Sequence, residues 1–441
     1  MSAKNIASVI LSNSSSAFII KVIGTGIAFI VQIILARVLG ADQYGAYIYI
    51  LAWINVVALI AKLGFDTLLV RMVSAYKIKE KWSHLKGIIV RSTQISLAFS
   101  IFLSLVVYVL FSEFTDLIEP EHKLPFLIGL CLVPILTLTG LRQGTLQALK
   151  EIPKSQIPEA IIRPFFLLLF FSSIYLLIDN GISATEALLA NIAAASVAFA
   201  IGTYWLIGSI PQETKHVKPA FETNEWLKIS IPLLVISGLH MILGQTDILM
   251  LGALLNTEAT GVYGAVSRVA GLVSFGLVAV NSIVAPLISE YYAQKSMADM
   301  QRMITISANG IFAFAAVASA VLIVAGPTLL SIFGEEFVVG YNPLIILLIG
   351  QIVSSLAGSV GFLMVMTGNQ KKASAIIFYG AIANIILNYI LIPIYGVVGA
   401  AIATSVSTVF WNLLMLGQVV KTLRINPTIL SNFKYLVKYN S

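Results

Sequence analysis

The sequence has 441 residues, of which 58% are hydrophobic and 11% charged, and its mean hydropathy is +0.94. Soluble domains carry about 25% charged residues, so this composition excludes an ordinary water-soluble protein. The apolar runs are about 20 residues long and do not alternate with polar residues, which favours membrane-spanning α-helices over a β-barrel. The net charge of +7 lies mainly in loops facing an anionic membrane surface, so no nucleic-acid partner is predicted.

Twelve apolar windows of membrane-spanning length follow one another along the chain. The first comes after a polar stretch without a small-residue cleavage site, so we expect a retained helix rather than a removed signal peptide. Cys131 is the only cysteine and lies in an apolar run, so no intrachain disulfide is predicted. The predicted spans are 17–36, 46–66, 88–111, 124–148, 157–178, 184–208, 228–254, 262–290, 303–325, 341–367, 373–393 and 396–420.

Positive charge is unevenly distributed between alternate loops. One set of loops holds nearly all the loop Lys and Arg residues, with the largest group in residues 71–87. The other set holds only Arg37 and Lys123, together with acidic residues such as Glu335 and Glu336. Because cytoplasmic loops are enriched in Lys and Arg, we predict that both termini are cytoplasmic. An even number of spans is consistent with this orientation.

The chain divides near its midpoint into two halves with six predicted spans each. We predict an N-terminal six-helix bundle at 1–208, a cytoplasmic linker at 209–227, and a C-terminal six-helix bundle with a short cytoplasmic tail at 228–441. Similar sequences follow the first span of each half, at 39–46 and 257–265. Parallel repeats of this kind are common in transporters, which bind substrate between the two repeats.

Short motifs in both halves resemble those of polysaccharide-export flippases. The residues that carry the resemblance are Ala36-Arg37-Val38-Leu39-Gly40, Tyr44-Gly45, Leu63-Gly64-Phe65 and Arg71, then Asp247, Leu251-Gly252, Val262-Tyr263 and Arg268. Together with chain length and span number, they make the whole sequence similar to O-antigen (Wzx-type) flippases of the multidrug/oligosaccharidyl-lipid/polysaccharide exporter superfamily.

This resemblance implies an all-α membrane protein with two six-helix bundles around a central cavity. It also implies alternating access and an undecaprenyl-pyrophosphate-linked oligosaccharide as cargo, in the bacterial inner membrane. Lipid II flippases of the same superfamily usually have two further C-terminal spans, and their absence here counts against a peptidoglycan role. The expected partners are the lipid-linked glycan and membrane lipids, while proton or cation coupling and a polysaccharide polymerase partner stay open.

Six cations lie within or at the ends of the predicted spans: Lys21, Lys62, Arg91, Arg142, Arg163 and Arg268. A charge at mid-bilayer costs at least about 2.5–3.5 kcal/mol, so such groups usually face a wet cavity or a partner. Near a helix end, the side chain can instead extend to the headgroups, which is the alternative for Lys62 and Arg91. Spacing of four residues predicts the ion pairs Glu159–Arg163 and Lys62–Asp66.

Lys21 and Arg142 lie deeper in their spans and have no acid at helical spacing. We therefore expect these two to bind the pyrophosphate from the cytoplasmic side, with help from Arg91, Arg163 and Lys62. Arginine binds phosphate through two parallel hydrogen bonds, whereas lysine acts as a point charge.

Polar residues recur on one face of several spans and are expected to line a common lumen. Packing between helices is the alternative explanation for each such face. The expected lining residues are Gln32, Asn55, Ser237, Ser274, Asn281, Gln351, Asn384 and Asn388.

Four residues are candidates for coupling or gating: Asp247, Arg268, His240 and Asp66. Asp247 and Arg268 both lie near the outer ends of adjacent predicted spans and are expected to form an ion pair. In the alternative, Asp247 and His240 titrate and couple transport to a proton gradient.

Two other functions share some of these features. A multidrug and toxic-compound antiporter has the same overall fold but typically uses buried acids for cationic drugs, whereas this chain is rich in buried cations. A membrane glycan polymerase or ligase would need a larger outer loop. No nucleophile–base spacing, metal-ligand cluster or P-loop is present, so neither enzymatic activity nor a cofactor is predicted.

Overall fold

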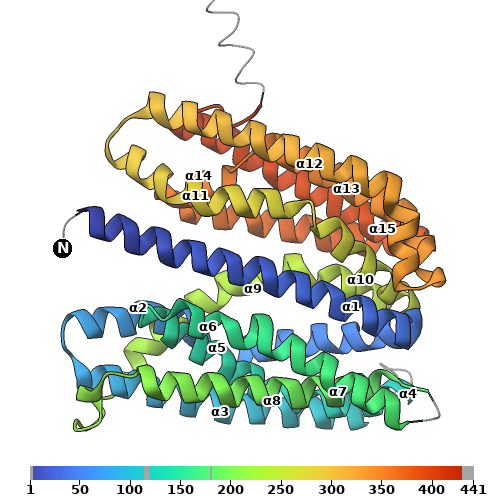
Figure 1. Ribbon diagram of the computed structural model, residues 1–441, viewed down its shortest axis with the longest axis horizontal. Coiled ribbons are helices and arrows are strands. Elements are labelled where there is room, and N and C mark those ends of the chain that lie inside the picture. Colours follow the sequence, from blue (N-terminus) through green and yellow to red (C-terminus); the bar gives the residue numbers. More distant parts are fainter. Residues whose placement is uncertain (1–2, 114–119, 179–180, 430–441) are drawn as a thin grey trace, which may run out of the picture. The chain divides into compact units, whose positions relative to one another are not determined.

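A computed structural model describes residues 3–113, 120–178 and 181–429 (Figure 1). This described part is α-helical, with short 3-10 and π turns and no β-strand. The first elements are α1 Ala3–Ala61, α2 Phe65–Ile78, α3 Trp82–Glu113, α4 Pro120–Gly129, α5 Leu132–Ala148, α6 Ile152–Ile157, the π turn Pro158–Ile162, α7 Arg163–Leu177 and α8 Ala184–Ser209. They are followed by a 3-10 turn Gln212–Thr214, α9 Thr223–Leu254, α10 Thr257–Gly271, α11 Ser274–Ala293, α12 Met297–Phe333, a 3-10 turn Glu335–Gly340, α13 Tyr341–Ala357, α14 Val360–Met366 and α15 Gln370–Leu423.

Nine helical stretches in the described residues are long and apolar enough to cross a bilayer, and the bent helix α9 makes a tenth. The first and last, Ile19–Ala61 and Gln370–Leu423, contain 43 and 54 residues. At 1.5 Å per residue they are about 65 and 80 Å long, more than twice the hydrocarbon thickness.

Glycine breaks explain the excess length of these two helices. Gly40 in α1 (φ 76°, ψ 169°) and Gly396 in α15 (φ 57°, ψ −132°) have positive φ angles outside the helical region. Side chains with a Cβ rarely adopt such angles, and the chain of α1 turns back on itself (Figure 1). If the helical arms on either side of each glycine break are counted as separate crossings, the described chain has the twelve membrane-crossing segments predicted from the sequence.

The described chain forms two compact units, which are considered separately. The first contains residues 1–39 and 46–241, and the second contains residues 40–45 and 242–441. Their boundary falls inside α9. The division at 208 and 228 and the duplication of a six-helix unit stay predictions.

The core of the first unit is built from α2, α3, α5 and the beginning of α9. Phe65 and Leu68 of α2 are completely buried, as is Trp226 of α9. The Trp226 indole donates to the hydroxyl of Tyr76 at 3.1 Å, and this hydroxyl donates to Glu222 at 3.1 Å. Burial raises the pKa of Tyr76 above its ordinary value, so the hydroxyl keeps the proton that it donates.

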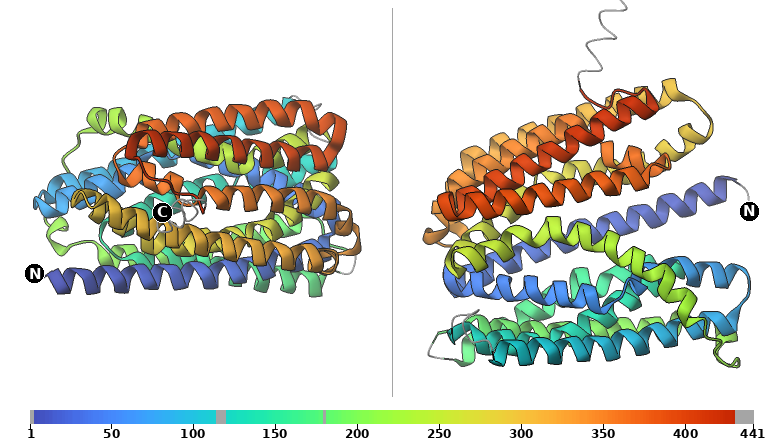
Figure 2. Two further views of the ribbon diagram at one scale, coloured as in Figure 1. Left: turned by 90° about the horizontal axis from the view of Figure 1, so that it is seen from above. Right: turned by 180° about the vertical axis from the view of Figure 1, so that it is seen from behind.

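In the second unit, helices α11 to α15 surround a core that includes Ile288, Met300, Leu363 and Met415. Helices α12, α13 and α15, coloured orange to red, lie side by side in both views of Figure 2.

The two similar sequences at 39–46 and 257–265 contact each other within the second unit. A Cβ atom on Gly45 would collide with the backbone of Thr257, and a Cβ atom on Gly261 with that of residue Ala41. The Thr257 hydroxyl donates to the carboxylate of Asp42 across this contact. Glycine at both positions therefore allows the backbones to approach closely.

Candidate functional site

A network of charged residues lies inside the first unit. Glu159 of the π turn binds Arg142 of α5 through one carboxylate oxygen and Arg163 of α7 through the other, each at 3.3 Å. The Arg142 side chain is 2% exposed, whereas those of Glu159 and Arg163 are 18% and 21% exposed. One carboxylate thus binds two guanidinium groups, so these three side chains together carry a surplus positive charge. The Glu159–Arg163 pair was predicted from spacing and is confirmed.

Arg142 is also bound by backbone groups of α8. Its guanidinium donates to the carbonyls of Ala198 and Phe199 at 2.9 and 3.2 Å. Gly202 leaves the space that this guanidinium occupies, because a Cβ atom there would collide with it. No acid lies at helical spacing from Arg142, and its acidic partner Glu159 comes from another part of the chain, which sequence spacing does not reveal. Its role in binding substrate stays a prediction.

Arg163 is oriented by an amide of the neighbouring helix. It donates twice to the side-chain oxygen of Asn191 in α8, at 2.9 and 3.2 Å. Asn191 in turn donates to the hydroxyl of Tyr47 at 2.8 Å. Asn191 and Tyr47 are both buried, so this hydrogen-bonded chain fixes Arg163 without the carboxylate.

Pro164 explains the π turn that carries Glu159. In a regular helix the ring of Pro164 would clash with the carbonyl of Ala160 and could not donate a hydrogen bond to it. The wider turn Pro158–Ile162, closed by a bond from the Arg163 N–H to the Pro158 carbonyl, accommodates this defect. Such turns inside α-helices often occur at functional sites.

A cavity of about 510 Å³ lies between α2 and α5 of the first unit. It is lined by the Lys62–Asp66 pair, by Arg71 and by the amides of Gln143 and Gln147. The complete lining is Lys62, Asp66, Thr67, Val70, Arg71, Gly140, Gln143, Gly144 and Gln147.

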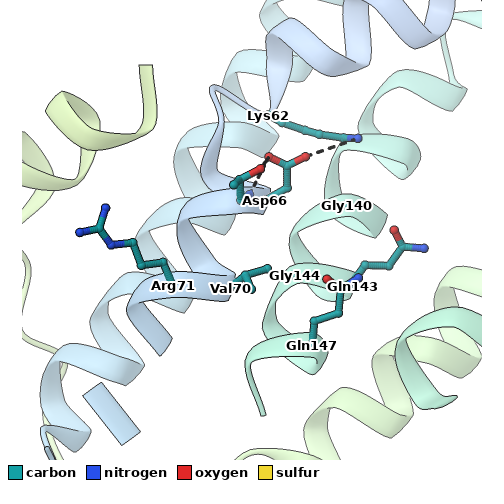
Figure 3. Close-up of a pocket in the computed structure, with 9 residues that line it drawn as sticks. Lys62, Asp66, Val70, Arg71, Gly140, Gln143, Gly144 and Gln147 are labelled. Carbon is teal, nitrogen blue, oxygen red and sulfur yellow. Dashed lines mark hydrogen bonds and ion pairs between the residues drawn. The ribbon is translucent and has the colours of Figure 1, made fainter. Parts of the chain in front are cut away.

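Figure 3 shows how the charged residues of this cavity lie. Lys62 extends toward α5 beside Gly140, whereas Arg71 points away from α5. Lys62 and Asp66 are 4.0 Å apart, so the predicted ion pair is confirmed. A Cβ atom on Gly140 would lie 2.6 Å from the Lys62 side chain, so the glycine provides the space for it.

Two further predicted cations lie elsewhere in the first unit. Arg91 donates to the Thr223 hydroxyl at 3.1 Å and lies 5.1 Å from the centre of the Phe221 ring. Its partners belong to the segment that leads into α9, so Arg91 holds that segment. Lys21 is exposed. Binding of substrate by either side chain stays a prediction.

In the second unit, Asp247 of α9 is the centre of a buried polar cluster. Its carboxylate accepts from the Tyr263 hydroxyl at 2.6 Å, the Thr404 hydroxyl at 2.5 Å and the Asn388 amide at 2.7 Å. Asn384 contributes a longer bond of 3.4 Å. These residues come from α9, α10 and both arms of α15, so tertiary packing assembles the cluster.

The predicted ion pair between Asp247 and Arg268 is not formed in the described residues. The Arg268 guanidinium instead donates to the Gly264 carbonyl at 3.1 Å and lies 5.8 Å from the centre of the Tyr44 ring. Both residues lie near the outer ends of their predicted spans, but hydroxyl and amide groups occupy the space around the Asp247 carboxylate. The side chain of His240 lies outside the described part of the structure.

The expected lining residues have different environments. Asn384 and Asn388 join the Asp247 cluster, and Asn281 is buried in α11. Ser274 donates to the Gly271 carbonyl of its own chain segment at 2.6 Å. Half-buried positions are occupied by Gln32, Asn55, Ser237 and Gln351. A lumen shared by all of them stays a prediction.

Comparison with known proteins places the chain in a family. A family model described as polysaccharide biosynthesis protein matches residues 10–292. The chain belongs to the polysaccharide biosynthesis protein family. Over 400 residues it is 25% identical to a probable low-salt glycan biosynthesis flippase, Agl15, of Haloferax volcanii, covering 90% of this chain and 80% of the relative.

Solved structures share the fold. An inward-facing multidrug resistance MATE family transporter of the MOP superfamily matches with a TM-score of 0.72 and 14% identity, over 95% of this chain and 98% of the other. The lipid II flippase MurJ in an inward closed conformation matches with a TM-score of 0.72 and 18% identity, over 93% of this chain and 87% of the other. The chain is therefore a multi-pass membrane protein with the fold of these transporters.

Several residues of the two clusters were not predicted from the sequence to belong to a site. Asn191 and Tyr47 orient Arg163, and Tyr263 and Thr404 bind Asp247. Asn191 could have been noticed as an amide in an otherwise apolar span. The hydroxyls of Tyr263 and Thr404 gave no comparable signal, because hydroxyl groups are common in membrane helices, where they bond to backbone carbonyls.

Proposed function

We propose that this protein is a flippase that moves an undecaprenyl-pyrophosphate-linked oligosaccharide, such as an O-antigen-like repeat unit, across the bacterial inner membrane. The glycan enters from the cytoplasmic leaflet and leaves to the outer leaflet by alternating access. Membership of the polysaccharide biosynthesis protein family and the similarity to a probable glycan flippase support this proposal.

The observation that carries the proposal is the surplus of positive charge inside the first unit. Arg142 and Arg163 share a single carboxylate, and the cavity between α2 and α5 adds the Lys62–Asp66 pair, with the exposed Arg71 among its lining residues. Unpaired positive charge in a membrane interior is unfavourable unless it serves an anionic ligand. The pyrophosphate of a lipid-linked glycan is such a ligand, and arginine and lysine suit it.

The Asp247 cluster supports coupling to a proton or a monovalent cation. The side-chain oxygens of Asn384 and Asn388 are buried and accept no hydrogen bond in the described structure. Together with the Asp247 carboxylate they form an oxygen-rich group that suits a hard cation or a proton. This coupling role belongs to the second unit, whereas the anion-binding role belongs to the first.

Complementation tests the flippase proposal. A bacterial strain lacking its own O-antigen flippase is given this chain, and surface polysaccharide is measured. We expect restoration by the wild type and about a tenfold loss with Lys62→Gln, because a hydrogen bond to a charged group is worth about 1.5–3 kcal/mol.

Lys228→Gln is the matched control, because Lys228 is 72% exposed and forms a surface pair with Glu225. It should restore polysaccharide like the wild type. Equal restoration by Lys62→Gln at equal abundance would remove Lys62 from substrate binding. Absence of restoration with a matched glycan, together with drug resistance on expression, would favour the multidrug antiporter instead.

A further inference from the structure

Glu159 differs from its two arginine partners in how firmly it is held. Both guanidinium groups keep neutral acceptors without it: two α8 carbonyls for Arg142 and the Asn191 amide for Arg163. The bonds of Glu159 to them are 3.3 Å each, longer than the usual 2.7–2.9 Å of a charge-assisted hydrogen bond. The arginines are therefore oriented independently of the carboxylate that neutralises them.

The three side chains of the network differ in exposure. Only 2% of the Arg142 side chain is exposed, whereas Glu159 and Arg163 each keep about a fifth of theirs accessible. An anion that approached this exposed edge would meet the carboxylate and Arg163 first. Because the carboxylate repels an anion, the two arginines can bind one only when Glu159 turns away.

We propose that Glu159 is an internal counter-anion, which the diphosphate of the lipid-linked substrate displaces from Arg142 and Arg163. This inference rests on the proposed flippase function and adds a release step to it. In the empty protein, Glu159 offsets the unfavourable energy of one buried and one half-buried cation. When substrate binds, its diphosphate takes over both guanidinium groups, and the return of Glu159 expels it after translocation.

Removing the negative charge of Glu159 should therefore strengthen diphosphate binding. The experiment uses the purified full-length protein in detergent and measures binding of farnesyl diphosphate by isothermal titration calorimetry. We expect Glu159→Gln to bind about tenfold more tightly than the wild type, the size of a lost competing charge-assisted hydrogen bond. Glu225→Gln, which removes an exposed carboxylate paired with Lys228, should bind like the wild type.

A purely structural ion pair predicts the opposite result. If Glu159 only holds the helices together, its removal should lower thermal stability and leave affinity unchanged or weaker, and either affinity result would overturn the inference. If Glu159→Gln does not fold, Glu159→Asp is the second variant, because it withdraws the carboxylate by one methylene. It should still raise the affinity for farnesyl diphosphate, and an unchanged affinity would also overturn the inference. The gain should vanish in the double variant Glu159→Gln with Arg163→Gln, and its persistence there would count against displacement from Arg163.

Two further comparisons show whether the bound anion is free or lipid-linked, and distinguish the counter-anion role from the flippase function. Inorganic pyrophosphate should show the same gain in affinity if the diphosphate alone is recognised. A gain with pyrophosphate that is missing with farnesyl diphosphate would contradict a lipid-linked ligand. Binding does not require flipping. If Glu159→Gln gains affinity but the wild type does not restore polysaccharide, the counter-anion role is supported and the flippase function is rejected. If the wild type restores polysaccharide but Glu159→Gln gains no affinity, the flippase function is supported and the counter-anion role is rejected.

Discussion

Asp247 shows how one residue can be buried as a carboxylate without a cationic partner in the described structure. Four donors from hydroxyls and amides surround it, with distances from 2.5 to 3.4 Å. Such bonds stabilise a negative charge that burial would otherwise disfavour. The amide oxygens of Asn384 and Asn388 beside it have no donor. A residue held this way is suited to exchange a proton or cation during a transport cycle.

Asp247→Asn should abolish coupling while leaving the fold intact. The amide has the same shape, and its oxygen can still accept from Tyr263 and Thr404. In proteoliposomes with an imposed proton or sodium gradient, wild-type flipping should respond to the gradient and that of the variant should not. Tyr263→Phe retains the carboxylate and should keep the response, with ion affinity raised about tenfold, because the lost hydroxyl donor stabilises the empty carboxylate and a hydrogen bond to a charged group is worth about 1.5–3 kcal/mol. A normal gradient response by Asp247→Asn would reject the coupling role.

Among the helices, α5 contributes residues to both the cavity and the charged network. Gly144 packs against the Asp66 backbone of α2, and Gly140 packs against the side chain of Lys62, just before α2. Arg142 extends to α8 and to Glu159 of the π turn. Glycines four residues apart allow close helix packing in membranes. The same four-residue spacing positions Gln143 and Gln147 along the cavity.

Gly144→Val should destabilise the first unit. Its new side chain would collide with the backbone carbonyl of Asp66, and overpacking of this kind typically costs about 1–3 kcal/mol. Thermal unfolding in detergent should show a lower midpoint for this variant. Gly208→Val is the control, because nothing lies within 4 Å of a Cβ atom there. Equal midpoints for the two variants would mean that α2 and α5 are not closely packed.

For the whole molecule, charge asymmetry is the strongest evidence for orientation. Basic residues gather at the end of α2 and in the loop that joins it to α3, where Lys77, Lys79 and Lys81 are all exposed. The turn between α12 and α13 carries Glu335 and Glu336, also exposed. Because positive loops stay in the cytoplasm, the two turns should lie on opposite sides of the membrane.

Cysteine labelling of intact cells tests this orientation. Cys131 is exposed, so it is first replaced by Ser, and a single cysteine is then introduced as Lys79→Cys or Glu335→Cys. A membrane-impermeant maleimide added outside should label the Glu335→Cys protein only. Permeabilised cells provide the control, since both should then be labelled. Labelling of Lys79→Cys from outside would reverse the proposed topology.

The sequence by itself determined the membrane class, the twelve crossing segments and the ion pairs between residues four positions apart. Hydrophobic length and four-residue spacing are local properties, so Lys62–Asp66 and Glu159–Arg163 could be predicted without knowing the packing. Tertiary structure alone decided that Arg142 binds the same carboxylate as Arg163, and that Asp247 binds hydroxyls and amides rather than Arg268. Those contacts join helices far apart in the chain, and a polar side chain in a membrane bonds to whichever group the packing brings near it.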